Sequence, residues 1–165
     1  MGIETTLKWL AASREFYIQM IQATPDDRLD WKPVAAQGDA TSILEITRHL
    51  IANEHPMRSM VVDGKWPEDT PMDPNWAASS SFAGAGPAAE VSDKADLVRM
   101  IREAGAETDQ AVRDVPDSAW NDTVSLPFMT DTRAGLVGLA ASHWSYHTGQ
   151  VAYLQRLYGD LKFMG

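Results

Sequence analysis

The sequence predicts an all-α protein, most simply a four-helix bundle, and three observations support this fold class. Apolar residues recur at helical spacing in four long segments, residues that begin and end helices flank these segments, and strand patterns are thin. The chain has 165 residues, of which 44% are hydrophobic. It is therefore long enough to bury a core and short enough for one domain, which we expect to span residues 1–165.

The first helix is predicted over Ile3–Ala23. One face of this segment carries the apolar residues Ile3, Leu7, Leu10, Tyr17 and Ile21. A second stripe, formed by Trp9, Phe16 and Met20, is not needed by the interior of a bundle. Exposed apolar surface of this kind usually marks a partner interface, so the stripe predicts a homodimer, unless another part of the same chain covers it.

The second helix begins at a capping box, in which Ser42 and Glu45 satisfy each other's free backbone donors. Pro56 predicts a kink or an end, and Gly64 is a plausible terminator. The side chains expected to face the interior are Ile43, Ile46, His49, Leu50, Asn53 and Met57.

The third helix is predicted over residues 92–115 and the fourth over residues 132–158, with Gly159 ending it. Thr123–Leu126, between them, is the only strand candidate, and it is short. The acidic residues are interpreted mostly as parts of solvated helix faces.

Residues 65–90 form a long insert between the second and third helices, rich in proline, glycine, alanine and serine. An ordered loop of this length is usually functional, often as a lid or as part of an interface. Trp66, Trp76 and Phe82 indicate that the insert packs on the bundle. A mobile surface loop is the alternative.

A weak internal sequence repeat supports the same architecture. Residues 23–27 follow the first helix and residues 114–118 follow the third, each with a proline and an aspartate, and Trp31 or Trp120 comes next. A loop and a histidine-bearing helix then follow in both halves. Two such helical hairpins, facing one another, would bring the second and fourth helices together.

Composition excludes several classes of function. The chain has no cysteine, so it has no disulfide framework, thiolate metal site or cysteine nucleophile. A formal net charge of −9 disfavours nucleic acid as a partner. No apolar run approaches the roughly 20 residues of a membrane span, and no signal-peptide pattern opens the chain. We therefore expect a cytoplasmic protein without a membrane partner.

The histidines are the most informative residues. His143 and His147 are four residues apart, so on a helix they lie one turn apart on the same face. His49 lies on the predicted second helix. Three neutral imidazoles from two packed helices would hold a divalent metal and leave a position for water or substrate, although a packed or surface histidine pair is the plainer interpretation of the spacing. His55 lies about 120° around the helix from His49 and is left out.

Three runs of sequence together resemble the DinB-like (damage-inducible) family of metal-dependent bundle proteins. They are residues 29–33, residues 43–50, and the motif His-x-x-x-His-x-Gly-Gln at 143–150, where Thr148 stands in the place of a more familiar arginine. The resemblance covers nearly the whole chain. It implies a four-helix bundle with a long crossover between helices two and three, a divalent metal on His49, His143 and His147, and frequently a homodimer.

The resemblance also implies a reaction class, since characterised relatives include thiol transferases that use low-molecular-weight thiols. The sequence thus predicts a metal-dependent thiol S-transferase or hydrolase acting on a small molecule. The alternative is a non-catalytic metal- or ligand-binding bundle that acts as a dimeric binding or sensing protein. Zinc is the first choice of metal and nickel the next, because imidazole ligands suit both.

Gln150 and Asn53 are candidates for orienting the ligands through hydrogen bonds, although a helix-packing amide is an equal interpretation of Gln150. Trp144 and Tyr146 are interpreted as packing residues. If the three imidazoles have the ordinary pKa of about 6.5, metal affinity should fall steeply below about pH 6.

Overall fold

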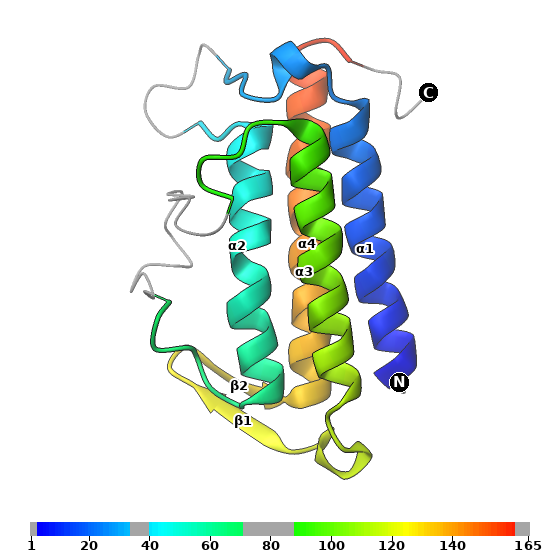
Figure 1. Ribbon diagram of the computed structural model, residues 1–165, viewed down its shortest axis with the longest axis vertical. Coiled ribbons are helices and arrows are strands. Elements are labelled where there is room, and N and C mark those ends of the chain that lie inside the picture. Colours follow the sequence, from blue (N-terminus) through cyan, green and yellow to red (C-terminus); the bar gives the residue numbers. More distant parts are fainter. Residues whose placement is uncertain (1–2, 34–39, 71–87, 161–165) are drawn as a thin grey trace.

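The computed structural model describes residues 3–33, 40–70 and 88–160, which form four long helices and a small hairpin (Figure 1). The helices are α1 (Ile3–Ala23), α2 (Ile43–Val62), α3 (Lys94–Arg113) and α4 (Arg133–Leu157), with 3₁₀ turns η1 (Asp26–Arg28) and η2 (Asp117–Ala119) and antiparallel strands β1 (Thr123–Leu126) and β2 (Met129–Thr132). The all-α fold class predicted from the sequence is confirmed.

The four helices form a bundle in which α1 and α4 run in one direction and α2 and α3 in the other (Figure 1). α1 packs most extensively on α4 and also on α3, while α2 packs on α3 and α4. α1 and α2 therefore occupy opposite corners. Because α2 and α3 are parallel, the chain between them has to return along the bundle, which is the long crossover expected between these helices.

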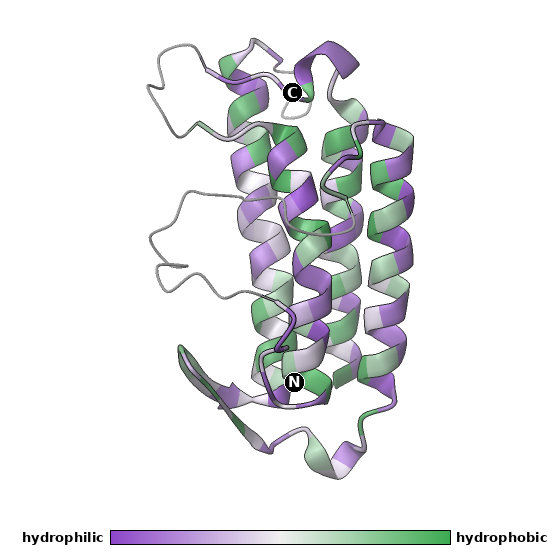
Figure 2. Cartoon of the chain, turned by 60° about the vertical axis from the view of Figure 1, so that its left-hand side comes forward, coloured by the Kyte–Doolittle hydropathy of each residue, from purple (hydrophilic) through white to green (hydrophobic). Residues whose placement is uncertain are grey.

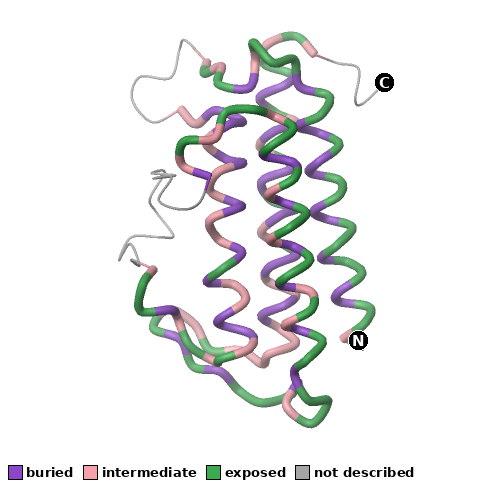
Figure 3. The backbone as a smooth tube through the Cα atoms, viewed as in Figure 1, coloured by how far each residue is buried: buried purple, intermediate pink, exposed green. Residues whose placement is uncertain are grey.

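The core consists of apolar side chains from all four helices. Each helix has hydrophobic and hydrophilic faces, and buried positions alternate with exposed ones along it (Figures 2 and 3). Leu7, Leu10, Tyr17 and Ile21 on the predicted stripe of α1 are at most 1% exposed. The capping box of α2 is present: Ser42 Oγ accepts from the Glu45 backbone N–H, and Glu45 Oε2 accepts from the Ser42 N–H.

Arg133 fastens the first turn of α4 to the last turn of α2. Its Nη1 donates to the carbonyl oxygens of Val61 and Val62, the latter at 2.6 Å. These carbonyls lie in the last turn of α2, where no further helical turn supplies donors for them. The guanidinium of Arg133 therefore caps the C-terminal end of α2 from the first turn of α4.

Three local predictions need correction. α2 continues through Pro56 to Val62, so of the kink or end predicted at this proline the end is excluded. The strand β2, which pairs with β1, is not indicated by the sequence pattern. Met20 is 1% exposed and belongs to the core, so it is not part of an outward stripe with Trp9 and Phe16. The internal sequence repeat is matched in the structure, because the 3₁₀ turns η1 and η2 occupy equivalent places after α1 and α3.

The described part of the insert packs on the molecule as predicted. Trp66 lies edge-on to Phe128 with ring centroids 5.6 Å apart, and its Nε1 donates to the Thr70 carbonyl oxygen at 2.7 Å. Trp76 and Phe82 lie outside the described residues. Among those described, no helix is long and apolar enough to cross a membrane.

Candidate metal centre

Three histidines from two helices turn their rings toward one another. His49 lies on α2, and His143 and His147 lie one turn apart on α4. Nε2 of His143 is 3.2 Å from Nε2 of His49 and 3.0 Å from Nε2 of His147. Two nitrogens bound to a tetrahedral zinc ion lie about 3.3 Å apart, because each Zn–N bond measures about 2.0–2.1 Å. The two distances are close to this value, and one ligand atom from each of the three histidines lies within 4.8 Å of the others, so the cluster fits one metal ion of this size.

Burial keeps these imidazoles neutral. Burial, reinforced by the proximity of the other two histidines, lowers the pKa of His143 to about 3. Burial and then the proximity of His147 lower the pKa of His49 to about 4. Burial also lowers the pKa of His147, although its hydrogen bond to Gln150 acts in the opposite direction. Protons should therefore compete with a metal only at a lower pH than the value of about 6 expected from ordinary imidazoles.

Gln150 holds His147 in the tautomer that a metal ligand requires. Nδ1–H of His147 donates to Oε1 of Gln150 at 2.6 Å, and Nε2 of Gln150 donates to the hydroxyl of Tyr146 at 3.2 Å, which fixes the orientation of the amide. With its proton on Nδ1, His147 turns the Nε2 lone pair toward the other two rings. This geometry supports the prediction that Gln150 orients a ligand.

Asn53 also reaches the cluster, but it presents its amide nitrogen. Nδ2 of Asn53 donates to the His49 carbonyl oxygen at 2.8 Å and lies 3.1 Å from Nδ1 of His49. A donor at Nδ1 favours the tautomer with the proton on Nε2, the atom that faces His143. For His49 to bind a metal through Nε2, the amide has to turn so that its oxygen faces Nδ1.

Of two other residues near the site, one agrees with the prediction made from the sequence and one does not. His55 is exposed and its Nε2 lies 3.2 Å from Asp69 Oδ1, so it takes no part in the histidine cluster, as predicted. Tyr146 is 64% exposed, so its interpretation as a packing residue is wrong. Trp144, by contrast, is 3% exposed and packs edge-on against Tyr17.

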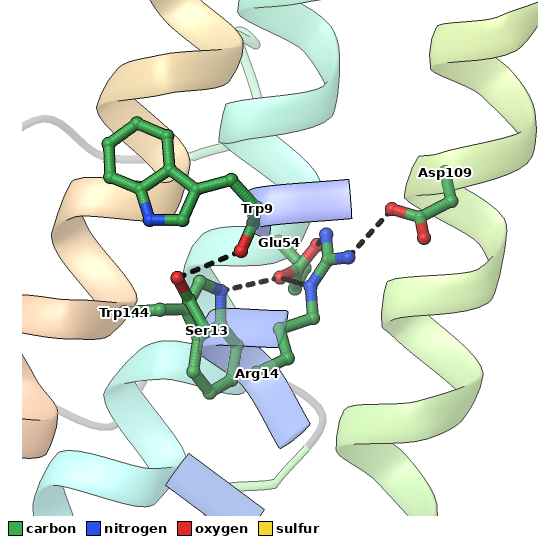
Figure 4. Close-up of polar contacts among 6 residues, drawn as sticks. All are labelled: Trp9, Ser13, Arg14, Glu54, Asp109 and Trp144. Carbon is green, nitrogen blue, oxygen red and sulfur yellow. Dashed lines mark hydrogen bonds and ion pairs between the residues drawn. The ribbon is translucent and has the colours of Figure 1, made fainter. Parts of the chain in front are cut away.

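A second polar cluster, not predicted from the sequence, lies in the bundle interior (Figure 4). Arg14 of α1 donates through Nε and Nη2 to the two carboxylate oxygens of Glu54 on α2, at 2.8 and 2.9 Å, and through Nη1 to Asp109 of α3, at 2.7 Å. Trp144 of α4 donates from Nε1 to Glu54 at 2.9 Å. This Arg14 cluster joins all four helices, and Arg14 and Glu54 are each 5% exposed.

The signal for the Arg14 cluster is present in the sequence. Arg14 falls in phase with Leu7, Leu10 and Tyr17 on the apolar stripe of the first helix, and a charge at such a position has to find a partner inside. The interpretation of acidic residues as solvated is therefore wrong for Glu54, because a buried guanidinium needs a buried carboxylate.

Comparison with known proteins places the chain in a family. Residues 2–151 match the DinB superfamily. The chain belongs to the DinB superfamily. This confirms the resemblance drawn from the histidine motif. None of the curated proteins matches the sequence.

Solved structures share the fold at low sequence identity. YfiT from Bacillus subtilis, a probable metal-dependent hydrolase with an unusual four-helix bundle topology, has a TM-score of 0.68 and 14% identity over 95% of this chain and 87% of its own. The mycothiol-dependent maleylpyruvate isomerase has a TM-score of 0.64 and 14% identity over 92% of this chain, which spans 61% of that protein.

A further solved structure contains a different kind of partner. The colibactin self-resistance protein ClbS, solved in complex with double-stranded DNA, has a TM-score of 0.72 and 12% identity over 94% of this chain and 96% of its own. At identities this low, the likeness to all three structures establishes the fold alone.

Proposed function

We propose that this DinB superfamily protein is a divalent-metal-dependent cytoplasmic enzyme, with His49, His143 and His147 as its metal ligands, and that it acts on a small molecule as a thiol S-transferase or a hydrolase. The observation that carries the proposal is the convergence of three neutral ring nitrogens at metal-ligand spacing. Zinc is the first candidate for the metal and nickel the second.

The chemistry of the donor set fits this role. When bound, a divalent metal on three uncharged imidazoles keeps its double charge and supplies a Lewis acid that acidifies a thiol or a water molecule. Gln150 holds the His147 ring in place through Nδ1. Because the chain has no cysteine, the sulfur of a thiol reaction has to arrive with a substrate.

The relatives support two reaction classes. The mycothiol-dependent isomerase supports chemistry with a low-molecular-weight thiol, and YfiT supports hydrolysis. The metal-loaded protein separates these classes when it is assayed with a thiol and an electrophile, and in parallel with ester and amide substrates.

Metal analysis tests the ligand assignment without an activity assay. Wild-type protein purified without chelator should hold about one metal ion per chain, and His143→Ala and His147→Ala should lose it. His55→Ala is the matched control, because His55 lies on α2 outside the cluster, and it should keep the wild-type metal content. A His147→Ala variant that retains its metal would show that the assignment is wrong.

A non-catalytic dimeric binding or sensing protein is the second candidate, favoured by Trp9 and Phe16, which are 41% and 47% exposed on α1. Light scattering at micromolar concentration tests the homodimer, and a monomer mass removes this candidate. A thermal melt with chelator adds a second criterion, since a purely structural metal contributes heavily to folding.

We further propose that nucleic acid is not a partner, in spite of the DNA complex of ClbS. The formal net charge of −9 would oppose binding to phosphates. A gel-shift assay with double-stranded DNA at low salt should show no complex, and a salt-sensitive complex would overturn this part of the proposal.

A further inference from the structure

A shallow groove runs along the junction of α2 and α4, directly beside the histidine cluster. It has a volume of about 430 Å³, and Ile46, Tyr146, Gly149, Tyr153 and Leu154 lie along it. Ile46 precedes His49 by three residues, about one helical turn, and Tyr153 follows His147 by six residues, or about 9 Å along the helix. The groove therefore begins within about one helical turn of the proposed metal ligands and extends toward the C-terminal end of α4.

Gly149 is the feature of this groove that needs an explanation. It lies inside α4, where glycine costs about 1 kcal/mol relative to alanine. A Cβ atom added there would meet no atom within 4 Å, so packing does not require glycine. A side chain at this position would, however, project into the groove between Tyr146 and Tyr153. An open groove thus gives a reason for a residue that otherwise weakens the helix.

The lining of the groove indicates what it can hold. Ile46 and Leu154 are buried and apolar, at 1% and 8% exposure, while Tyr146 and Tyr153 each remain 64% exposed on the flanks. The lining residues, all within the described part of the chain, include no charged side chain. Exposed phenol rings beside an apolar floor suit an uncharged planar group, and they offer a carboxylate or phosphate no cationic partner.

Gln150 links the groove to the metal ligands. It lines the groove and also contacts Nδ1 of His147 and the hydroxyl of Tyr146. A group seated between the two tyrosines would lie against the amide that orients one of the proposed ligands.

We propose that the groove binds an uncharged aromatic or similarly planar apolar part of the substrate, next to the metal at which the reaction takes place. The assignment of this group to the substrate rests on the proposed function. Binding in the groove itself requires only the residues that line it, and none of them is a proposed metal ligand.

The test uses 2-naphthol as the probe, with 2-naphthalenesulfonate as its charged counterpart, and measures binding by calorimetry. The wild-type protein should bind 2-naphthol and should bind the sulfonate about tenfold more weakly or not at all. Gly149→Leu fills the groove and should weaken 2-naphthol binding by about tenfold or more. Because leucine is the better helix former, this variant should fold at least as well as the wild type.

Gly138→Ala is the matched control, since it replaces another glycine of α4, next to Trp9 and away from the groove, and its Cβ meets only ordinary contact at 3.9 Å. It should bind 2-naphthol like the wild type. The proposal is overturned if the wild type does not bind 2-naphthol, if Gly149→Leu binds it unchanged, or if the sulfonate binds equally well.

Metal content, measured on the same samples, separates this proposal from the proposed function. Gly149→Leu should keep the wild-type metal content, because residue 149 is not one of the three clustered histidines. If the wild-type protein holds no metal but still binds 2-naphthol in a manner sensitive to Gly149→Leu, the metal assignment fails and the groove stands.

Discussion

Two polar clusters occupy the interior of this bundle, and they are satisfied in different ways. In the Arg14 cluster every charge meets its opposite, and the partners come from all four helices. In the histidine cluster three like groups from two helices meet one another, with ring nitrogens 3.0 and 3.2 Å apart. The first cluster pairs opposite charges, whereas the second gathers three like rings, and the proposed metal site rests on this gathering.

The pKa values show the same contrast. Burial alone would lower the pKa of Arg14, but the ion pairs with Glu54 and Asp109 outweigh it and raise this pKa. For His143, burial is the largest effect and the neighbouring His147 and His49 act in the same direction, so its pKa falls to about 3. The Arg14 cluster therefore stabilises charge in the interior, whereas burial keeps the imidazoles of the histidine cluster uncharged.

Arg14→Met gives the largest expected effect. It leaves the Glu54 carboxylate buried with Trp144 as its remaining partner, and breaking a buried ion pair in this way costs about 3–5 kcal/mol of unfolding free energy. Urea denaturation measures the loss. Arg102→Met is the matched control, because Arg102 pairs with Glu15 on the surface and such pairs contribute less than about 1 kcal/mol.

The same variant tests whether the two clusters are independent. Folded Arg14→Met at low temperature should still bind one equivalent of zinc. If it folds but no longer binds metal, the Arg14 cluster positions the histidines and the two clusters are not independent.

Trp144→Phe should give a smaller loss. Phenylalanine keeps the edge-on packing against Tyr17 but removes the Nε1–H that donates to Glu54. A hydrogen bond to a charged group contributes about 1.5–3 kcal/mol, so the unfolding free energy should fall by about this amount. Trp9→Phe, at an exposed position on α1, should change stability much less, and equal losses in the two variants would contradict the role given to this hydrogen bond.

The smallest effect, counted per histidine and per pH unit, is a slope of stability with pH in the metal-free protein. The unfolded chain takes up protons on its histidines near pH 6.5, whereas His49 and His143 in the folded chain resist them down to about pH 4 and 3. Stability with chelator present should therefore fall as the pH drops below about 6.5. His143→Ala should flatten the slope by up to about 1.4 kcal/mol per pH unit, measured by urea denaturation across this range. Parallel slopes in the two proteins would contradict the lowered pKa of His143.

Much of the fold could be predicted because its signals are local. The capping box at Ser42 and the helical spacing of apolar residues belong to short stretches of sequence, and they place the helices within a few residues. β2 could not be predicted in the same way, because the residues of Met129–Thr132 have little apolar character and become a strand only by pairing with β1.

The candidate site was predictable to a different degree for each residue. The histidine cluster follows from spacing on two helices that pack together. The donor presented by Asn53 does not, because it depends on which end of one amide faces a ring. The pairing of Arg14 with Glu54 joins helices at opposite corners of the bundle, and no pattern within either helix identifies the partner.

The distance along the chain between the proposed ligands has a consequence for how this architecture tolerates insertions. His49 and His143 are 94 residues apart, so a metal that joins them would close a large loop containing the crossover. The entropy lost on closing such a loop grows only with the logarithm of its length, and each doubling adds about 0.6 kcal/mol. Residues added between α2 and α3 would therefore lower the metal affinity only slightly. The bundle can carry crossovers of very different length while the same three side chains remain within reach of one another.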